Sequence, residues 1–289
     1  MVIFINENGI EQKSGYSNPI TATIGLGRSM IWKVIAQSVI GSSHVAGGKS
    51  CEDAVHYCQI LLPDGDEALI GFVSDGAGSA IYAAEASATA VKQGAEILSG
   101  WIAAEKEIDD TALVELAEQI YDQLNGLAKE KEVPLNEFSC TLLGFVLLPQ
   151  KACFMQIGDG AIARNDGNGY FTHLWWPHNG EYQNTTTFLI DDPNLRNLNT
   201  KLIQESITEV ALFTDGLQML ALNNETETVH QPFLNDLFKV LRMTESREHI
   251  DILNNRLAGY LASDTINSRT DDDKTLLLAT RLTHGKQVV

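Results

Sequence analysis

The sequence predicts an α+β protein in which two central antiparallel β-sheets pack together and a pair of helices flanks each sheet. Three observations indicate this four-layer αββα sandwich. Short β-branched and aromatic runs recur along the chain, and two pairs of amphipathic helices separate them. The order is therefore strands, two helices, strands, two helices and a last strand. A parallel doubly wound fold would instead alternate strand and helix throughout.

The first strands are predicted where apolar and β-branched residues lie between turn residues, over 32–39, 55–62 and 68–73. Pro63 and the Asp-Gly-Asp that follows it separate the second run from the third. This composition is typical of a hairpin turn. We therefore expect 55–62 and 68–73 to pair as neighbouring antiparallel strands.

Two helices are predicted next, each with one apolar stripe. Apolar residues recur at intervals of three and four from Ile81 to Leu98, and again from Leu113 to Leu127. Asp109 and the two residues after it provide an acidic start signal for the second helix. The many alanines of the first helix favour close packing on a sheet.

The second half of the chain repeats the pattern. Strands are predicted over 141–148 and 152–157, a long polar surface loop over 166–200, a strand over 209–214, helices around 233–241 and 250–261, and a final strand over 275–280. We expect an N-terminal extension of unassigned role over 1–30 and a single domain over 31–289.

Composition excludes several classes of protein. The formal net charge of -18 would repel a phosphate backbone, so we expect no nucleic-acid partner. The N-terminus lacks a basic n-region, and no apolar run is as long as a membrane span, so we expect a cytoplasmic protein without a membrane partner. The four cysteines have no zinc-type spacing and are expected to be reduced.

Carboxylates stand at the edges of the predicted strands. Asp75, Asp159 and Asp215 each precede a glycine near the end of an apolar run, while Asp53 and Asp272 lie in acidic pairs or runs that precede a strand. Each Asp-Gly pair taken alone is also an ordinary turn. Several converging carboxylates repel one another unless they surround a cation, and Mg2+ and Mn2+ prefer oxygen ligands. The joint occurrence favours a multi-metal phosphate-ester hydrolase.

In this order the motifs resemble those of PPM-type protein phosphatases, the metal-dependent type 2C class of serine/threonine phosphatases. The motifs are Glu52-Asp53-Ala54, Ser74-Asp75-Gly76, Gly158-Asp159-Gly160, Thr214-Asp215-Gly216 and Asp272-Asp273-x-Thr275. The segment from Gly180 to Leu189 also resembles the flap region of a bacterial branch of this family. No single motif is specific, but the ordered set is.

The resemblance implies two Mn2+ or Mg2+ ions, with a third, looser ion as in bacterial relatives. The metal ligands it implies are Glu52 (through water), Asp53, Asp75, Gly76 (through its carbonyl), Asp159, Asp215 and Asp272. Asp75 would bridge the two ions, and Asp53, Asp75, Asp215 and Asp272 would form the catalytic centre. A hydroxide that bridges the ions would attack phosphoserine or phosphothreonine in line. The implied partner is a phosphorylated protein, with a cognate serine/threonine kinase system as its source.

The chain departs from the family at the expected phosphate contact. Many relatives have an arginine where this chain has Gly48, and the adjacent Lys49 is the candidate phosphate ligand, as a point charge without a bidentate fork. His44 lies near the first motif and is a candidate to assist protonation. The departures motivate an alternative, which is a catalytically weak or silent phosphatase-fold module that binds a phosphoprotein partner in signalling.

Overall fold

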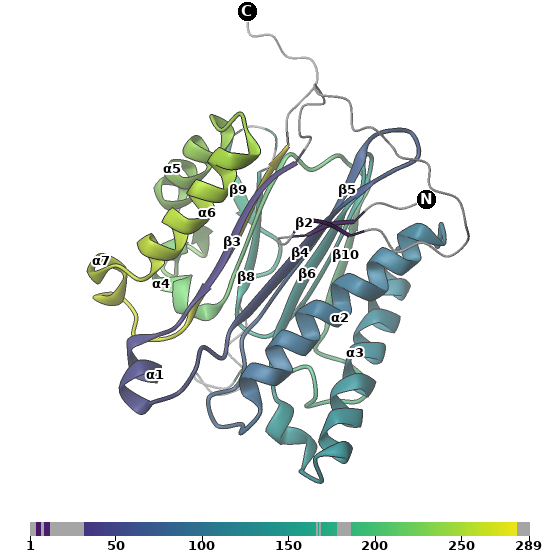
Figure 1. Cartoon of the computed structure of the whole chain (residues 1–289), viewed down its shortest axis with the longest axis vertical. Helices are drawn as coiled ribbons and strands as arrows, with labels where there is room; N and C mark the ends of the chain where they lie inside the picture. Colours follow the sequence, from purple (N-terminus) through teal and green to yellow (C-terminus); the bar gives the residue numbers. More distant parts are fainter. Residues whose placement is uncertain are drawn as a thin grey trace, which may run out of the picture.

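The computed structural model describes residues 4–6, 9–11, 32–165, 167, 169–177 and 186–281. Two sheets lie face to face between two layers of helices (Figure 1). All strand pairs within each sheet are antiparallel. The αββα sandwich that the sequence predicts is therefore confirmed.

The first sheet has seven strands among the described residues. In spatial order they are β10 (Asn199–Ile203), β7 (Ala152–Ile157), β6 (Leu142–Leu147), β5 (Glu67–Ser74), β4 (Ala54–Leu61), β1 (Phe4–Asn6) and β2 (Gly9–Glu11). The predicted hairpin between β4 and β5 closes through a hydrogen bond from Leu62 N to Asp66 O, with Gly65 at a φ of 91°. That positive φ is the reason a glycine stands in this turn.

The second sheet has five strands in the same part of the chain. In spatial order they are β3 (Trp32–Val39), β14 (Lys274–Arg281), β11 (Glu209–Phe213), β8 (Ala161–Asn165) and β9 (Phe171–His173). A small separate hairpin joins β12 (Leu222–Asn223) to β13 (Thr228–Val229). The first and last strands of the predicted domain, β3 and β14, pair along their whole length.

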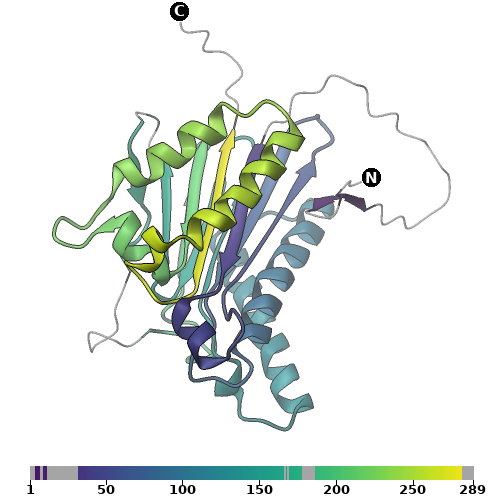
Figure 2. The same ribbon diagram turned by 60° about the vertical axis from the view of Figure 1, so that its left-hand side comes forward.

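The long helices form the outer layers. Helices α2 (Ala83–Ala103) and α3 (Asp110–Glu130) cover the first sheet, and α5 (Gln231–Arg242) and α6 (Arg247–Leu261) cover the second (Figure 2). The predicted acidic start of α3 is confirmed, because Asp109 caps the helix and its side chain accepts a hydrogen bond from Ala112 N at 2.9 Å. Short helices fill connections: α1 (Ser42–Gly47), η1 (Leu135–Phe138), η2 (Asp215–Leu217), α4 (Gln218–Ala221) and α7 (Asp264–Asn267).

Three apolar layers hold the four structural layers together. Strand β5 shows how alternation builds two of them, because Ile70 and Phe72 pack toward α2 and α3 while Leu69 and Val73 pack toward the second sheet. The third layer lies between the second sheet and α5 and α6, where Phe238 is fully buried. Both faces of β5 are therefore buried, which explains its near-continuous apolar sequence.

The structure differs from the sequence analysis over 166–200 and adds elements at two other places. The polar segment 166–200 is not a loop throughout, because β9 and the start of β10 lie in it and pair with β8 and β7. Helix α1 was not predicted, since it has six residues and no buried apolar face. Residues 4–6 and 9–11 extend the first sheet by pairing β1 with β4, so part of the predicted extension adds strands to the domain. Residues 178–185, which include most of the predicted flap, lie outside the described residues.

The four cysteines are free, as predicted. In the part of the chain that the structure describes, none of the helices combines the length and the apolar character needed to cross a membrane.

Candidate metal centre

The predicted acids meet at one edge of the sandwich because of the strand order. Antiparallel pairing places the start of β4 beside the end of β5, and the start of β14 beside the end of β11. The connection from β7 to β8 passes from the first sheet to the second at the same edge. Acids before β4 and β14, after β5 and β11, and between β7 and β8 are therefore brought to one place.

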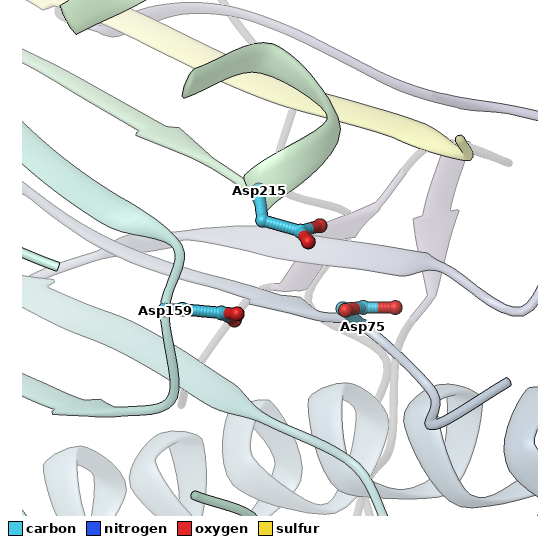
Figure 3. Close-up of side chains that lie close together, drawn as sticks. All are labelled: Asp75, Asp159 and Asp215. Carbon is cyan, nitrogen blue, oxygen red and sulfur yellow. The ribbon is translucent and has the colours of Figure 1, made fainter. Parts of the chain in front are cut away.

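Asp75, Asp159 and Asp215 form the centre of this cluster. One carboxylate oxygen from each lies within 4.8 Å of the others. Figure 3 shows the three side chains pointing toward one another from the end of β5, the β7–β8 connection and the start of η2. Three oxygen donors that converge from two sheets are an arrangement that suits a hard divalent cation.

Among the described residues, these acids face mainly one another, and their charges repel. Burial and the charges of Asp53, Asp215 and Asp159 raise the pKa of Asp75 well above its ordinary value. Burial, together with Asp159, Asp272 and Asp53, raises the pKa of Asp215 to about 8. Bound cations would reverse both effects, because a positive charge favours the ionised carboxylates.

Asp53 is buried, and residues at the end of β11 and the start of β14 hold its carboxylate in place. Its Oδ2 accepts a hydrogen bond from Thr214 Oγ1 at 2.7 Å, and Thr214 Oγ1 in turn accepts one from Thr275 N at 3.0 Å. Burial raises the pKa of Asp53 to about 7, although hydrogen bonds from Thr214, Thr275 and Asp75 lower it. The chain from Thr275 to Thr214 to Asp53 therefore fixes this carboxylate beside Asp75.

Asp159 carries the clearest sign of a missing partner. Its Oδ2 accepts a hydrogen bond from Thr186 Oγ1 at 2.5 Å, but its buried Oδ1 has no hydrogen-bond partner among the residues that the structure describes. Burial raises the pKa of Asp159, with Asp272 contributing in the same direction. A buried, unpartnered carboxylate oxygen is costly unless something outside the protein binds it. The residues present thus fit a divalent cation with oxygen ligands.

The acidic run before β14 divides into two roles. Asp272 is half-buried, and its charge acts on Asp159 and Asp215, but it is not within the converging group of three. Asp273 is only 2% exposed and accepts hydrogen bonds from Gly41 N at 2.6 Å and Glu52 N at 2.5 Å. The charge of Asp272 therefore acts on Asp159 and Asp215, while Asp273 acts on Asp53 and also joins the segments at Gly41 and Glu52.

Glu52 is held at the side of the cluster by two basic residues. Its carboxylate lies 3.1 Å from Lys49 Nζ and 3.6 Å from His44 Nε2. Lys49 Nζ also donates to Gly78 O at 2.6 Å, and the Lys49 side chain is 40% exposed. The predicted phosphate ligand is therefore partly exposed and already in contact with Glu52, which directly precedes Asp53.

Two glycines of the motifs are required by close approach. A Cβ on Gly76 would lie 2.5 Å from Ala83 O, and one on Gly216 would lie 1.9 Å from Asp273 O. Neither position tolerates a side chain without moving backbone, which is why each acid is followed by glycine. Cys51 is unsuited to act as a nucleophile, because burial and the neighbouring Asp273 and Asp53 raise its pKa.

The sequence analysis assigned no role to three contributors, Thr214, Thr186 and Asp273. Thr214 and Asp273 stand within the motifs, next to Asp215 and Asp272, and that position was the available signal. Their partners could not be read from the sequence, because the contacts of Thr186 with Asp159 and of Asp273 with Glu52 span 27 and 221 residues.

The sequence is similar to that of known protein phosphatases. The family model described as protein phosphatase 2C matches residues 40–262. Serine/threonine-protein phosphatase 3 of Escherichia coli (strain K12) is 35% identical over 251 residues, which cover 86% of this chain and 98% of the relative.

Solved structures share the fold at low sequence identity. A serine/threonine phosphatase of S. agalactiae has a TM-score of 0.58 at 14% identity, covering 87% of this chain and 100% of its own. The serine/threonine phosphatase Stp1 from Staphylococcus aureus has a TM-score of 0.54 at 15% identity, covering 90% of this chain and 98% of its own.

Proposed function

Because this chain belongs to the protein phosphatase 2C family, we propose that its acidic centre removes phosphate from phosphoserine and phosphothreonine in a protein partner. The chain is a metal-dependent protein serine/threonine phosphatase. The observation that supports the site assignment is the convergence of Asp75, Asp159 and Asp215, with a buried Asp159 oxygen that no group in the described part of the chain binds.

The assignment of the other ligands rests on the family resemblance. Asp53, Asp75, the Gly76 carbonyl, Asp215 and Asp272 would hold two ions. Asp159 would hold a third ion, and Glu52 would act through water. When bound, Mn2+ or Mg2+ supplies an activated water and positive charge for the phosphoryl group. Both ions accept the same oxygen ligands, so the choice between them is open.

The residues around the ligands keep the carboxylates in place. Thr214 holds Asp53 through one carboxylate oxygen and leaves the other oxygen for a cation. Thr186 does the same for Asp159. Such hydrogen bonds orient ligands and raise the affinity of a site for its metal. The protons that Asp53 and Asp215 retain near neutral pH would leave their carboxylates on loading.

Lys49 is the proposed contact for the substrate phosphate. Its Nζ donates to Gly78 O at 2.6 Å and to the two carboxylate oxygens of Glu52 at 3.1 and 3.5 Å, and a phosphate oxygen would replace the longest of these three bonds. Lysine supplies a point charge here, and this suits a phosphate that bound cations already orient. The phosphoprotein partner requires a serine/threonine kinase that phosphorylates it. We propose that this chain and its partner are cytoplasmic.

The decisive experiment is Mn2+-titrated hydrolysis of a phosphothreonine peptide by the wild type and by Asp75→Asn. We expect phosphate release that depends on Mn2+ and is lost in Asp75→Asn. Asp122→Asn is the matched control, because Asp122 is exposed on α3 and this variant should keep full activity. Metal binding without release from any phosphopeptide would instead support the silent binding module.

A further inference from the structure

A cavity of about 500 Å³ lies at the opposite edge of the second sheet from the acidic centre. The ends of β3, β8, β11 and β14 and helix α5 line it. Strand β11 leads from Glu209 in the cavity wall to Asp215 in the acidic centre. At about 3.3 Å per residue these sites lie roughly 20 Å apart. The cavity is therefore separate from the proposed catalytic site.

Polar residues and one glycine make up the wall of the cavity. It carries three cations, Lys33, Arg242 and Arg281, and one carboxylate, Glu209, and its other members are asparagine, threonine and glycine. Sites for drug-like molecules are mostly lined by hydrophobic and aromatic side chains, whereas the residues that line this cavity are charged, polar or glycine. It therefore suits a ligand that is polar throughout.

Two of the three cations already have acidic partners. Arg242 makes two hydrogen bonds of 2.6 Å to the carboxylate of Glu209, and Arg281 donates to Asp66 Oδ1 at 2.6 Å. Glu209 also accepts from Thr280 Oγ1 at 2.9 Å. These contacts hold the side chains of the wall in place and pair Glu209 and Asp66 with the two arginines.

Lys33 is the cation without such a partner. The residue is 4% exposed, and its Nζ donates to the backbone O of Arg242 at 2.6 Å. Among the described residues no carboxylate lies within ion-pair distance of Nζ. Glu245 acts on it only from farther away, raising a pKa that burial lowers. An ammonium has three N–H donors, and one is used here.

Two neighbouring polar groups are also unused. The Thr208 hydroxyl and the Asn235 carboxamide line the cavity, and neither has a hydrogen-bond partner within the described part of the chain. A buried cation without a counter-ion is costly, and an anion in the cavity would offset that cost. Its oxygens would accept hydrogen bonds from Lys33, Thr208 and Asn235 together.

We propose that this cavity binds a small polar anion whose phosphate or carboxylate group contacts Lys33. The polar wall fits the class of sugar phosphates and hydroxycarboxylates. A nucleotide is a poorer match, because no aromatic side chain is present in the wall to stack on a base. This inference does not depend on the proposed phosphatase activity.

The test is a titration of the full chain with inorganic phosphate, glycerol 3-phosphate and citrate, with glycerol as the uncharged control. Backbone amide NMR shifts are recorded in Mg2+ and again in EDTA. We expect at least one anion to bind with a Kd of about 1 mM or tighter. The shifts should lie at Lys33, Asn235 and Thr280 and persist in EDTA. The relative response to phosphate and citrate distinguishes the two kinds of ligand.

Variants locate the binding. Lys33→Met should weaken it by about tenfold or more, since a hydrogen bond to a charged group is lost. Asn235→Asp, on a half-buried helical position, should also weaken it by placing a negative charge in the wall. Lys129→Met, on the exposed face of α3, is the matched control for net charge.

Three results would overturn the proposal: no binding of any anion at about 10 mM, equal binding by the wild type and both cavity variants, or shifts confined to Gly76 and Gly216. If Lys33→Met does not fold, Asn235→Asp decides. Phosphatase activity of Lys33→Met, measured separately, should match that of the wild type, so a failure here is distinct from failure of the proposed function.

Discussion

Nδ1 of His44 lies 2.9 Å from Oδ2 of Asp273, which connects helix α1 to the start of β14. The same Asp273 accepts hydrogen bonds from Gly41 N and Glu52 N, and the other nitrogen of His44 lies 3.6 Å from Glu52 Oε2. A single buried carboxylate thus joins three segments around the first acidic motif. The sequence suggests His44 as a residue that assists protonation in the reaction. In the structure it lies between Asp273 and Glu52, where it supports the position of Glu52.

Replacement of Asp273 tests this junction. We expect Asp273→Ala to lower the free energy of unfolding by about 3 kcal/mol, because two buried N–H groups lose their acceptor. Urea unfolding followed by circular dichroism measures this value. Asp271→Ala is the control, since Asp271 is exposed in the same acidic run and its loss should change stability little. Equal stabilities of the two variants would contradict the assigned role.

Thr214 provides a test of ligand orientation. Thr214→Val keeps the shape of the side chain but removes the hydrogen bond to Asp53 and the acceptor for Thr275 N. We expect the affinity for Mn2+ to fall by about tenfold, as measured by calorimetric titration. Thr172→Val, on the exposed side of edge strand β9, should bind Mn2+ as the wild type does. An unchanged affinity in Thr214→Val would remove Thr214 from the supporting shell.

The raised carboxylate pKa values predict how stability varies with pH in EDTA. The pKa of Asp53 is about 7 and that of Asp215 about 8, both above the ordinary 3.8. Between the ordinary pKa of 3.8 and these raised values, the folded protein therefore binds more protons than the unfolded chain. Its stability falls as pH rises through that range. We expect metal-free protein to be less stable at pH 8 than at pH 5, by on the order of 6 kcal/mol.

Two comparisons isolate the cause of that pH dependence. Asp215→Asn removes one titrating carboxylate and should flatten the decline measured by urea unfolding in EDTA. Mn2+ added at pH 8 should stabilise the wild type, because cations favour the ionised carboxylates and bind only the folded state. A decline of the same slope in Asp215→Asn would assign the pH dependence to other groups.

Lys49 tests the proposed phosphate contact. We expect Lys49→Ala to lower kcat/KM for a phosphothreonine peptide by about tenfold, because a charge-assisted hydrogen bond to phosphate is lost. Steady-state kinetics at saturating Mn2+ measures the change, and Lys49→Arg should recover part of it. Lys129→Ala, remote from the centre, serves as the control. Full activity in Lys49→Ala would leave phosphate binding to the metal centre alone.

Local patterns in the sequence were enough to predict the fold. The alternation of Leu69, Ile70, Phe72 and Val73 and the stripe of α3 depend on neighbours within a few residues, and such signals are readable without the tertiary structure. The acids Asp75, Asp159 and Asp215 were identified for a related reason, because each stands next to a glycine at the end of an apolar run.

The tertiary structure alone decided what surrounds these acids. The roles of Asp272 and Asp273 differ because Asp273 is buried and accepts hydrogen bonds from Gly41 N and Glu52 N, whereas Asp272 is half-buried and its charge acts on Asp215. The bond from Thr186 to Asp159 and the polar cavity at Lys33 likewise join residues far apart along the chain. Contacts of this kind leave no periodic trace in a single sequence, because they depend on the packing of whole sheets.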